Sequence, residues 1–367
     1  MRPVWLLAFI WILPAVSLTG HLRAQTCDPI DPVEILRNGT SHGVGESLLE
    51  SDLVRDRVNA RMVVCASKNV PLKTLRGKVG SPPDFDKRLQ QLVEAKLLVR
   101  ERDRVRAAFP ILLGEDRDKY MRAASRIAER IKQEFRPELS GILEEVDRRG
   151  WHEWQFHFLW SQLFDSQLMW VNLINEGFVP PIAPVRYWVV YPPNAATAGT
   201  SYFPQQEIGE FFFAVTWTPK GADTTDPIRQ NSIALLAAAL RGGKLPGRLS
   251  GTGLVDENGD LRIPVLRPGD QLLEHLRQAS DKYAKVVTAA IPVREFQRLT
   301  GADHQLAGAM AYHDVTYELL SRLQSEGKIT LPPALQARVH NSDLRGTTAI
   351  IPVYQPFIGM IEAAMKP

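Results

Sequence analysis

The stretch from His152 to Trp170, "HEWQFHFLWSQLFDSQLMW", places three tryptophans, three phenylalanines and two histidines in nineteen residues. We expect residues 151–178 to form one helix that links two parts of the chain. At about 100° per residue, one broad face takes most of the aromatic side chains, together with Leu159 and Leu163. A face of this kind is typical of a protein core. Gln155, Gln162 and Ser166 share another face, which we expect to be solvated.

A narrow polar stripe separates these two faces of the predicted helix. His157, Ser161 and Asp165 follow one another at intervals of four residues. His157 and Asp165 then lie about 12 Å apart, so they cannot share a metal ion without further ligands. The stripe is either a hydrogen-bonded seam against a neighbouring element or one wall of a pocket, and the sequence leaves both open.

A second candidate lies near the C-terminus in "AMAYHDVTYELL". On a helix, His313 falls in the middle of an apolar face, and Asp314 and Glu318 lie one turn apart on its flank. A histidine in this position is either a hydrogen-bonded core residue or a member of a site. A hydrolase would use His157, Asp165 and His313 as catalytic residues, and Ser161, Asp314 and Glu318 are candidate binding residues. Known zinc, nucleotide and nucleophile motifs are missing from the sequence, so we expect neither a cofactor nor a metal.

The N-terminus predicts export from the cytoplasm. Arg2 precedes the apolar run "VWLLAFIWILPAVSL", and Ala24 precedes Gln25. This order is typical of a signal peptide over residues 1–24, with an uncleaved anchor as the alternative. After cleavage no remaining stretch is apolar enough to cross a membrane. We therefore predict a periplasmic or extracellular protein.

The two cysteines, Cys27 and Cys65, are candidates for one disulfide bridge in such an oxidising compartment. The alternative is a buried free thiol at Cys65. The bridge would join an irregular arm, residues 25–45, to the first long helix of a domain over residues 46–150.

That domain begins with a predicted helix carrying Val54, Val58 and Met62 at helical spacing. A short helix, "VPLKTLRGKVG", a helix, "SPPDFDKRLQQLVEAKLLV", and a hairpin, "LLVRERDRVRAAFPIL", follow it. The segment from residue 46 to about residue 115 resembles a winged-helix domain in this order of elements. The resemblance implies a helical domain with a two-stranded wing, whose middle helix enters the DNA major groove in many family members. Here acidic residues alternate with basic ones on that helix and wing, so we expect a protein partner and consider nucleic acid unlikely.

Residues 179–367 are expected to form a mixed α+β domain. In it, "VRYWVVY" and "GEFFFAVTW" are strands that could pair. The whole chain, with 44% hydrophobic and 23% charged residues and a net charge of +3, has globular composition. We predict a mostly helical α+β protein with a winged-helix-like N-terminal domain.

Three functions agree with these features. The first is an exported module that binds a small ligand or a protein. The second is an extracytoplasmic hydrolase that uses the histidine and aspartate cluster. The third is a membrane-anchored winged-helix regulator.

Overall fold

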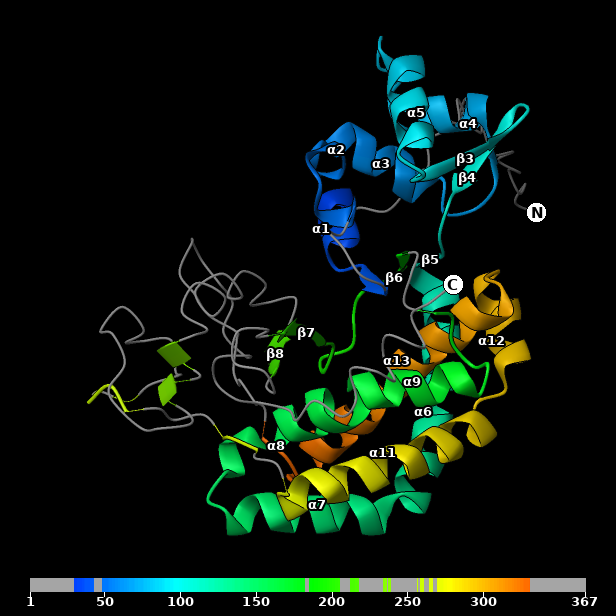
Figure 1. Cartoon of the computed structure of the whole chain (residues 1–367). Coiled ribbons are helices and arrows are strands. Elements are labelled where there is room, and N and C mark those ends of the chain that lie inside the picture. Colours follow the sequence, from blue (N-terminus) through cyan, green and yellow to red (C-terminus); the bar gives the residue numbers. More distant parts are fainter. Residues whose placement is uncertain are drawn as a thin grey trace, which may run out of the picture.

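The computed structural model describes residues 30–42, 48–181, 185–204, 212–217 and 269–330, with a few short pieces between 234 and 266. Figure 1 shows two groups of elements: a small group at the N-terminal end and a larger group of long helices. The signal segment and Cys27 lie outside the described residues. The sequence also predicts a helix over residues 232–243, a hairpin over residues 253–266 and short extended segments near the C-terminus. Most of the first, much of the second and nearly all of the third lie outside the described residues as well. The mostly helical α+β class is confirmed.

The smaller group contains short helices and two small sheets. Its elements are α1 (Pro32–Arg37), β1 (Thr40–His42), η1 (Leu48–Glu50), α2 (Asp52–Arg55), α3 (Arg57–Cys65), β2 (Val70–Pro71), α4 (Leu72–Lys78), α5 (Phe85–Glu94), β3 (Leu98–Glu101) and β4 (Arg104–Ala107). The short helix, helix and hairpin predicted from residue 70 onward are all present. Strands β2, β3 and β4 form one antiparallel sheet in the order β2-β4-β3.

The first long helix of this group is divided in two. Asp56 ends α2 and caps α3, where its carboxylate accepts hydrogen bonds from the backbone N–H groups of Val58 and Asn59, both at 2.9 Å. A side chain that satisfies two N–H groups at a helix start stabilises a new helix there. The apolar spacing therefore predicted the helical residues, and the cap decided where the chain turns.

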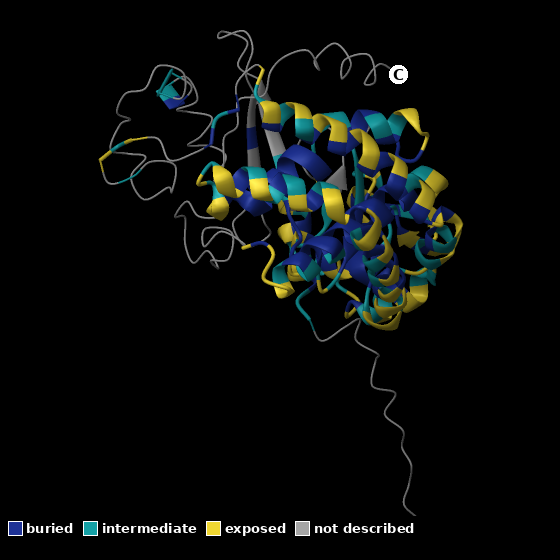
Figure 2. Ribbon diagram, turned by 90° about the horizontal axis from the view of Figure 1, so that it is seen from below, coloured by how far each residue is buried: buried dark blue, intermediate teal, exposed yellow. Residues whose placement is uncertain are grey.

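The larger group consists of helices around one core. Its elements are α6 (Gly114–Glu134), α7 (Arg136–Arg148), η2 (His152–Trp154), α8 (Gln155–His157), η3 (Phe158–Phe164), α9 (Gln167–Asn175), β7 (Gly199–Pro204), β8 (Phe212–Trp217), α11 (Gln271–Ala290), α12 (Val293–Thr300) and α13 (His304–Ser325). The helices bury one side and expose the other, as Figure 2 shows by the alternation of dark blue and yellow along them. Pro137 in the sequence predicts a kink or a break of the long helical stretch, and a break is present, because α7 starts at Arg136.

Two hydrophobic cores divide at residues 111 and 112. The N-terminal core is a cluster of side chains from Ile35 to Ile111, joined by Val189, and the helical core extends from Leu112 to Ile329. Helices α6 and α7, which the sequence analysis grouped with residues 46–150, contribute their buried side chains to the helical core.

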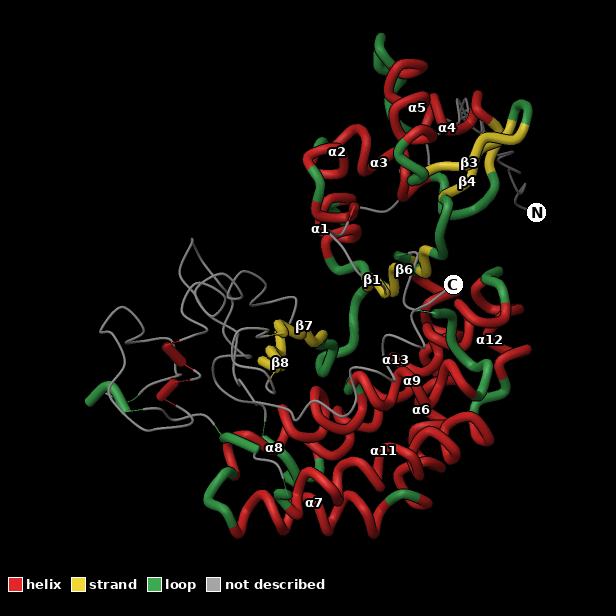
Figure 3. The backbone as a smooth tube through the Cα atoms, viewed as in Figure 1, coloured by secondary structure: helices red, strands yellow, loops and turns green. Residues whose placement is uncertain are grey.

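A small sheet lies between the two cores. Strand β6 (Arg186–Val190) pairs antiparallel with β1 and parallel with β5 (Ile111–Leu112); Figure 3 shows β1 and β6 between the two groups. Successive side chains of a strand point to opposite faces. Val189 accordingly joins the N-terminal core, while Trp188 and Val190 join the helical core. The predicted pairing of this strand with residues 209–217 is wrong, because β8 pairs with β7 instead.

The aromatic segment is not the single helix predicted over residues 151–178. It begins with a short 3-10 turn, continues as α8 and the π-helix η3, and breaks at Asp165 before α9. In the π-helix the Asp165 N–H donates to the Trp160 carbonyl, five residues back, at 2.7 Å. The wider turn changes the faces. Gln162 in this helix, and Gln155 in α8 before it, were expected in solvent and are buried.

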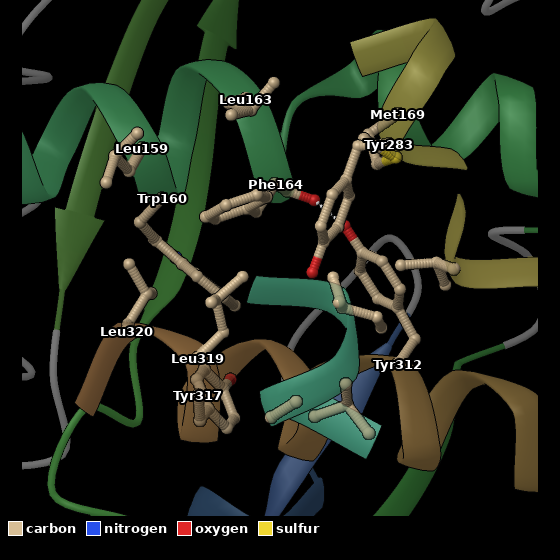
Figure 4. Close-up of a cluster of buried hydrophobic side chains, with 14 of the residues drawn as sticks. Leu159, Trp160, Leu163, Phe164, Met169, Tyr283, Tyr312, Tyr317, Leu319 and Leu320 are labelled. Atoms are coloured by element: carbon tan, nitrogen blue, oxygen red, sulfur yellow. Dashed lines mark hydrogen bonds between the residues drawn. The ribbon is translucent and has the colours of Figure 1, made fainter. Parts of the chain in front are cut away.

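The aromatic side chains form core, as the apolar face predicted. Trp160 is completely buried and stacks on Tyr317 with ring centroids 4.9 Å apart. Figure 4 shows Phe164 between this pair and two further tyrosines, Tyr283 and Tyr312. The Tyr312 hydroxyl donates to the Phe164 carbonyl. No helix in the described part of the chain is both long and apolar enough to span a membrane.

Candidate functional site

The polar stripe of the aromatic segment lies inside the helical core. His157 and Ser161 are fully buried and Asp165 is 8% exposed. Asp165 follows the last residue of the π-helix, so its carboxylate lies where the regular backbone hydrogen bonding ends. Buried polar groups require partners. The neighbouring hairpin supplies them.

Two threonines of this hairpin face the stripe. Thr200 of β7 and Thr216 of β8 are directly opposite each other in the antiparallel pair. His157 Nδ1 is hydrogen-bonded to Thr216 Oγ1 at 2.5 Å, and Ser161 Oγ lies 3.0 Å from Thr200 Oγ1. Ser161 Oγ is also hydrogen-bonded to Thr216 Oγ1. The stripe thus joins the helical core to the hairpin through hydroxyl groups.

Asp165 is the far end of the same seam. Its carboxylate accepts a hydrogen bond from Trp170 Nε1 at 2.9 Å and further hydrogen bonds from the side chain and backbone of Thr200. Burial dominates its ionisation and raises the pKa of Asp165 to about 6, against the lowering effect of these donors. The carboxyl can therefore exchange a proton near neutral pH.

His157 is a neutral imidazole in the folded protein. Burial lowers the pKa of His157 to about 3, because no nearby carboxylate offsets the loss of water. Its Nε2 atom has no hydrogen-bond partner among the described residues. A buried imidazole nitrogen without a partner costs stability.

His313 has an aromatic environment. Its Nδ1 donates to the Ala309 carbonyl at 2.9 Å, one helical turn back. The rings of Trp160, Trp170 and Trp188 surround it, with centroids 5.2–6.2 Å from the imidazole. Burial lowers the pKa of His313 to about 4, so this ring is neutral as well.

Asp314 and Glu318 of α13 belong to a third set of polar contacts. Asp314 is buried, not on an exposed flank, and accepts a hydrogen bond from the Tyr120 hydroxyl at 2.8 Å. Burial, together with the charge of Glu318, raises the pKa of Asp314 to about 7. Glu318 accepts from Asn194 Nδ2 at 2.6 Å.

The structure brings some of the predicted residues together and leaves others apart. His157, Ser161 and Asp165 belong to one hydrogen-bonded seam, but His157 and Asp165 are at opposite ends of it. His313 bonds to its own helix, and Asp314 bonds to α6. No group of three histidine, cysteine or carboxylate side chains among the described residues is arranged to hold a metal ion.

Thr200, Thr216 and Tyr120 were not among the residues predicted from the sequence. Thr216 stands beside the apolar residues of "FFFAVTW", where a buried hydroxyl requires a partner. That position was the available signal. Its partner could not be predicted, because β8 was assigned to the wrong neighbour.

The chain matches no family model, and neither a curated protein nor a solved structure shows significant similarity to it.

Proposed function

We propose that the chain is an exported binding protein built from two domains that divide near residue 111. The N-terminal domain, which resembles a winged-helix domain, binds an acidic partner, and the helical domain supports it. The uneven distribution of charge carries the proposal. Residues 72–107 hold ten basic and five acidic residues, a net charge of +5, whereas the whole chain has +3.

Ion pairing leaves much of this basic charge uncompensated. Within the segment, Asp84 pairs with Arg88, Asp86 with Arg76 and Glu101 with Arg106. The other seven basic side chains of the segment make no ion pair with a described carboxylate: Lys73, Lys78, Lys87, Lys96, Arg100, Arg102 and Arg104. Excess charge of one sign attracts a partner of the other sign and speeds association.

Catalysis by the helical domain is supported less well than binding by the N-terminal domain. A hydrolase would need His157, Asp165 and His313 to meet a substrate, but all three are buried. His157 is hydrogen-bonded to the hairpin, and so is Ser161. These contacts support a role in holding the hairpin on the helices. The geometry therefore favours the binding module over the hydrolase.

Binding can be measured by fluorescence anisotropy with the mature chain and a labelled polyglutamate peptide, with a neutral peptide of equal length as reference. We expect the double charge reversal Lys87→Glu/Arg102→Glu to weaken binding at least tenfold. The single reversal Arg294→Glu, at an exposed site on α12, should change it less than twofold. Equal loss in both variants, or no preference for the acidic peptide, would contradict the proposal.

A membrane-anchored winged-helix regulator is the second candidate, because the same basic side chains suit the phosphates of DNA. A labelled DNA duplex in the same assay separates the two. Tight duplex binding that falls steeply with salt favours the regulator, and a preference for the acidic peptide favours the first proposal.

Export is tested separately. A fusion of residues 1–30 to a reporter that is active only outside the cytoplasm should be active. The proposed bridge between Cys27 and Cys65 is tested by mass spectrometry of the unreduced protein, which should find the two cysteine peptides linked. Cys65 lies buried at the end of α3.

A further inference from the structure

Five side chains form an unbroken series of hydrogen bonds through the helical core. His157 Nδ1 meets Thr216, Thr216 meets Ser161, Ser161 meets Thr200, and Thr200 meets the carboxyl of Asp165. Three hydroxyl groups therefore lie between an imidazole and a carboxyl. This series goes beyond the proposed binding function, because it lies in the helical core.

The number of hydrogens constrains how these groups can be arranged. Each of the four contacts requires one hydrogen, and each of the three hydroxyls can donate only one. At least one end group must therefore supply a hydrogen to the series. The supplier is either His157 through Nδ1–H or Asp165 through a protonated carboxyl.

The end group that supplies the hydrogen decides which way all the hydrogen bonds of the series point. With an ionised Asp165, Thr200 donates to the carboxylate, the other hydroxyls point the same way, and His157 donates from Nδ1. Its Nε2 is then a bare acceptor. With a protonated Asp165 the hydroxyls reverse, Thr216 donates to Nδ1, and the imidazole hydrogen moves to Nε2.

We propose that the series from His157 to Asp165 is a two-state proton relay, in which uptake of one proton by the series protonates Asp165 and exchanges the tautomer of His157. The proton balance is simple. His157 passes its Nδ1 hydrogen to Thr216, each hydroxyl passes one hydrogen on, and Asp165 gains one O–H bond. The one proton that the series gains is bound at His157 Nε2. His157 Nε2 changes from acceptor to donor although the imidazole stays neutral.

The surroundings of the two end groups suit such an exchange. Asp165 is faced by Trp170 from α9, by Thr200 from β7, and by the hydroxyls of Tyr312 and Tyr317 from α13. No basic side chain contributes to its ionisation among these described groups. The pKa of Asp165, about 6, places the exchange near neutral pH.

His157 is faced by Thr216 from β8 and by the edge of the neighbouring Phe158 ring. The pKa of His157, about 3, keeps its ring neutral while Asp165 titrates. An ordinary histidine would instead gain a second hydrogen and become an imidazolium.

Nitrogen-15 NMR of the imidazole side chains tests the relay, because its two-bond correlations distinguish Nδ1–H, Nε2–H and imidazolium forms. The full mature chain would be titrated from about pH 8 to about pH 4.5, with His157→Gln used to assign the His157 signals. We expect His157 to change from the Nδ1–H to the Nε2–H tautomer as Asp165 takes up its proton. A single tautomer throughout, or direct conversion to imidazolium, would overturn the proposal.

Two variants of Thr216 provide the matched comparison. Thr216→Val removes the hydroxyl but keeps the side-chain volume, and should leave the His157 tautomer independent of pH. Thr216→Ser keeps the hydroxyl and should retain the exchange. Exchange that persists in Thr216→Val would overturn the relay, and the titration of the unmodified chain decides the question if that variant fails to fold.

Discussion

The two cores of this protein differ in what they bury. Among the described residues, the N-terminal core encloses one buried polar side chain, Asn59, and its amide is hydrogen-bonded to Leu53 and Arg88. The remaining buried polar and charged side chains lie on the helical side, from Gln155 to Thr316. The smaller core is therefore stabilised by apolar burial, whereas the larger core holds groups whose burial opposes folding.

Buried atoms without partners sharpen this contrast. Four of them lie within residues 155–162 of the aromatic segment: Gln155 Oε1, His157 Nε2, Trp160 Nε1 and Gln162 Nε2. None of the unpartnered buried atoms in the described part of the chain belongs to residues 30–111. Groups kept at the expense of stability concentrate at functional sites. The difference separates an N-terminal core that is almost entirely apolar from a helical core that keeps polar groups at a cost in stability.

The largest expected effect is the loss of a buried aromatic side chain, on which both cores depend. Trp160→Ala should lower the free energy of unfolding by about 3–5 kcal/mol, through lost burial and the cavity that remains. Phe85→Ala should cost a similar amount in the N-terminal core, because that ring is also buried. Denaturant unfolding measures both.

Trp160→Phe is the control, because it removes an unpartnered N–H while it keeps an aromatic ring. We expect a smaller loss than for alanine. A Trp160→Ala protein as stable as the parent would refute the core assignment.

The second prediction tests whether buried charge opposes folding in the helical core. The pKa of Asp314 is about 7 when folded, above its ordinary value of 3.8, so its favourable contribution is full below about pH 4 and is lost as pH rises through 7. Asp314→Asn cannot ionise and keeps an acceptor for the Tyr120 hydroxyl. The variant should be more stable than the parent by on the order of 2–4 kcal/mol at pH 8, with the gain vanishing near pH 4.

Unfolding curves at a series of pH values measure this difference. The change in stability should follow the titration of one group. A pH-independent difference would show that Asp314 does not carry the effect.

A smaller effect is expected at the polar seam. His157→Ala should cost roughly 1–3 kcal/mol, because Thr216 loses its hydrogen-bond partner. His304→Ala, at an exposed histidine that starts α13, should leave stability nearly unchanged. Thermal or denaturant melts compare the two. Unchanged or raised stability in His157→Ala would show that the seam is kept for function and not for the fold.

The smallest effect belongs to the surface of the N-terminal domain. Asp86→Asn breaks the ion pair with Arg76, in which both side chains are largely exposed. Exposed pairs contribute about 0–1 kcal/mol, and salt weakens them further. We expect a change in this range by denaturant unfolding. A loss well above this range would show that a surface ion pair, and not only apolar burial, stabilises the N-terminal group of elements.

Much of the fold could be predicted from periodicity alone. The helical spacing of Val54, Val58 and Met62 marked α2 and α3, and Pro137 marked the start of α7. The aromatic face was correctly assigned to the core. Sheet partners could not be predicted, because β6 pairs with β1 and β5, residues distant in sequence whose pairing depends on how the two cores meet.

The candidate site divides in the same way. The spacing of His157, Ser161 and Asp165 indicated a common stripe, and the structure joins them in one seam. Their environment depends on the threonines of β7 and β8 and on the π-helix. No local sequence pattern predicted either. The burial of Asp314 could not be predicted either, because α13 is buried on nearly all sides by residues distant in sequence.

The sequence by itself determined what local physics controls: which residues are helical, where proline breaks a helix, and which faces are apolar. Only the tertiary structure decided which face of β6 packs on which core and which hydroxyl is hydrogen-bonded to His157. It also decided how far burial raises the pKa values of Asp165 and Asp314. The reason is physical. Helical periodicity arises from neighbours in the chain, whereas strand pairing, desolvation and buried hydrogen bonds arise from residues that folding alone brings together.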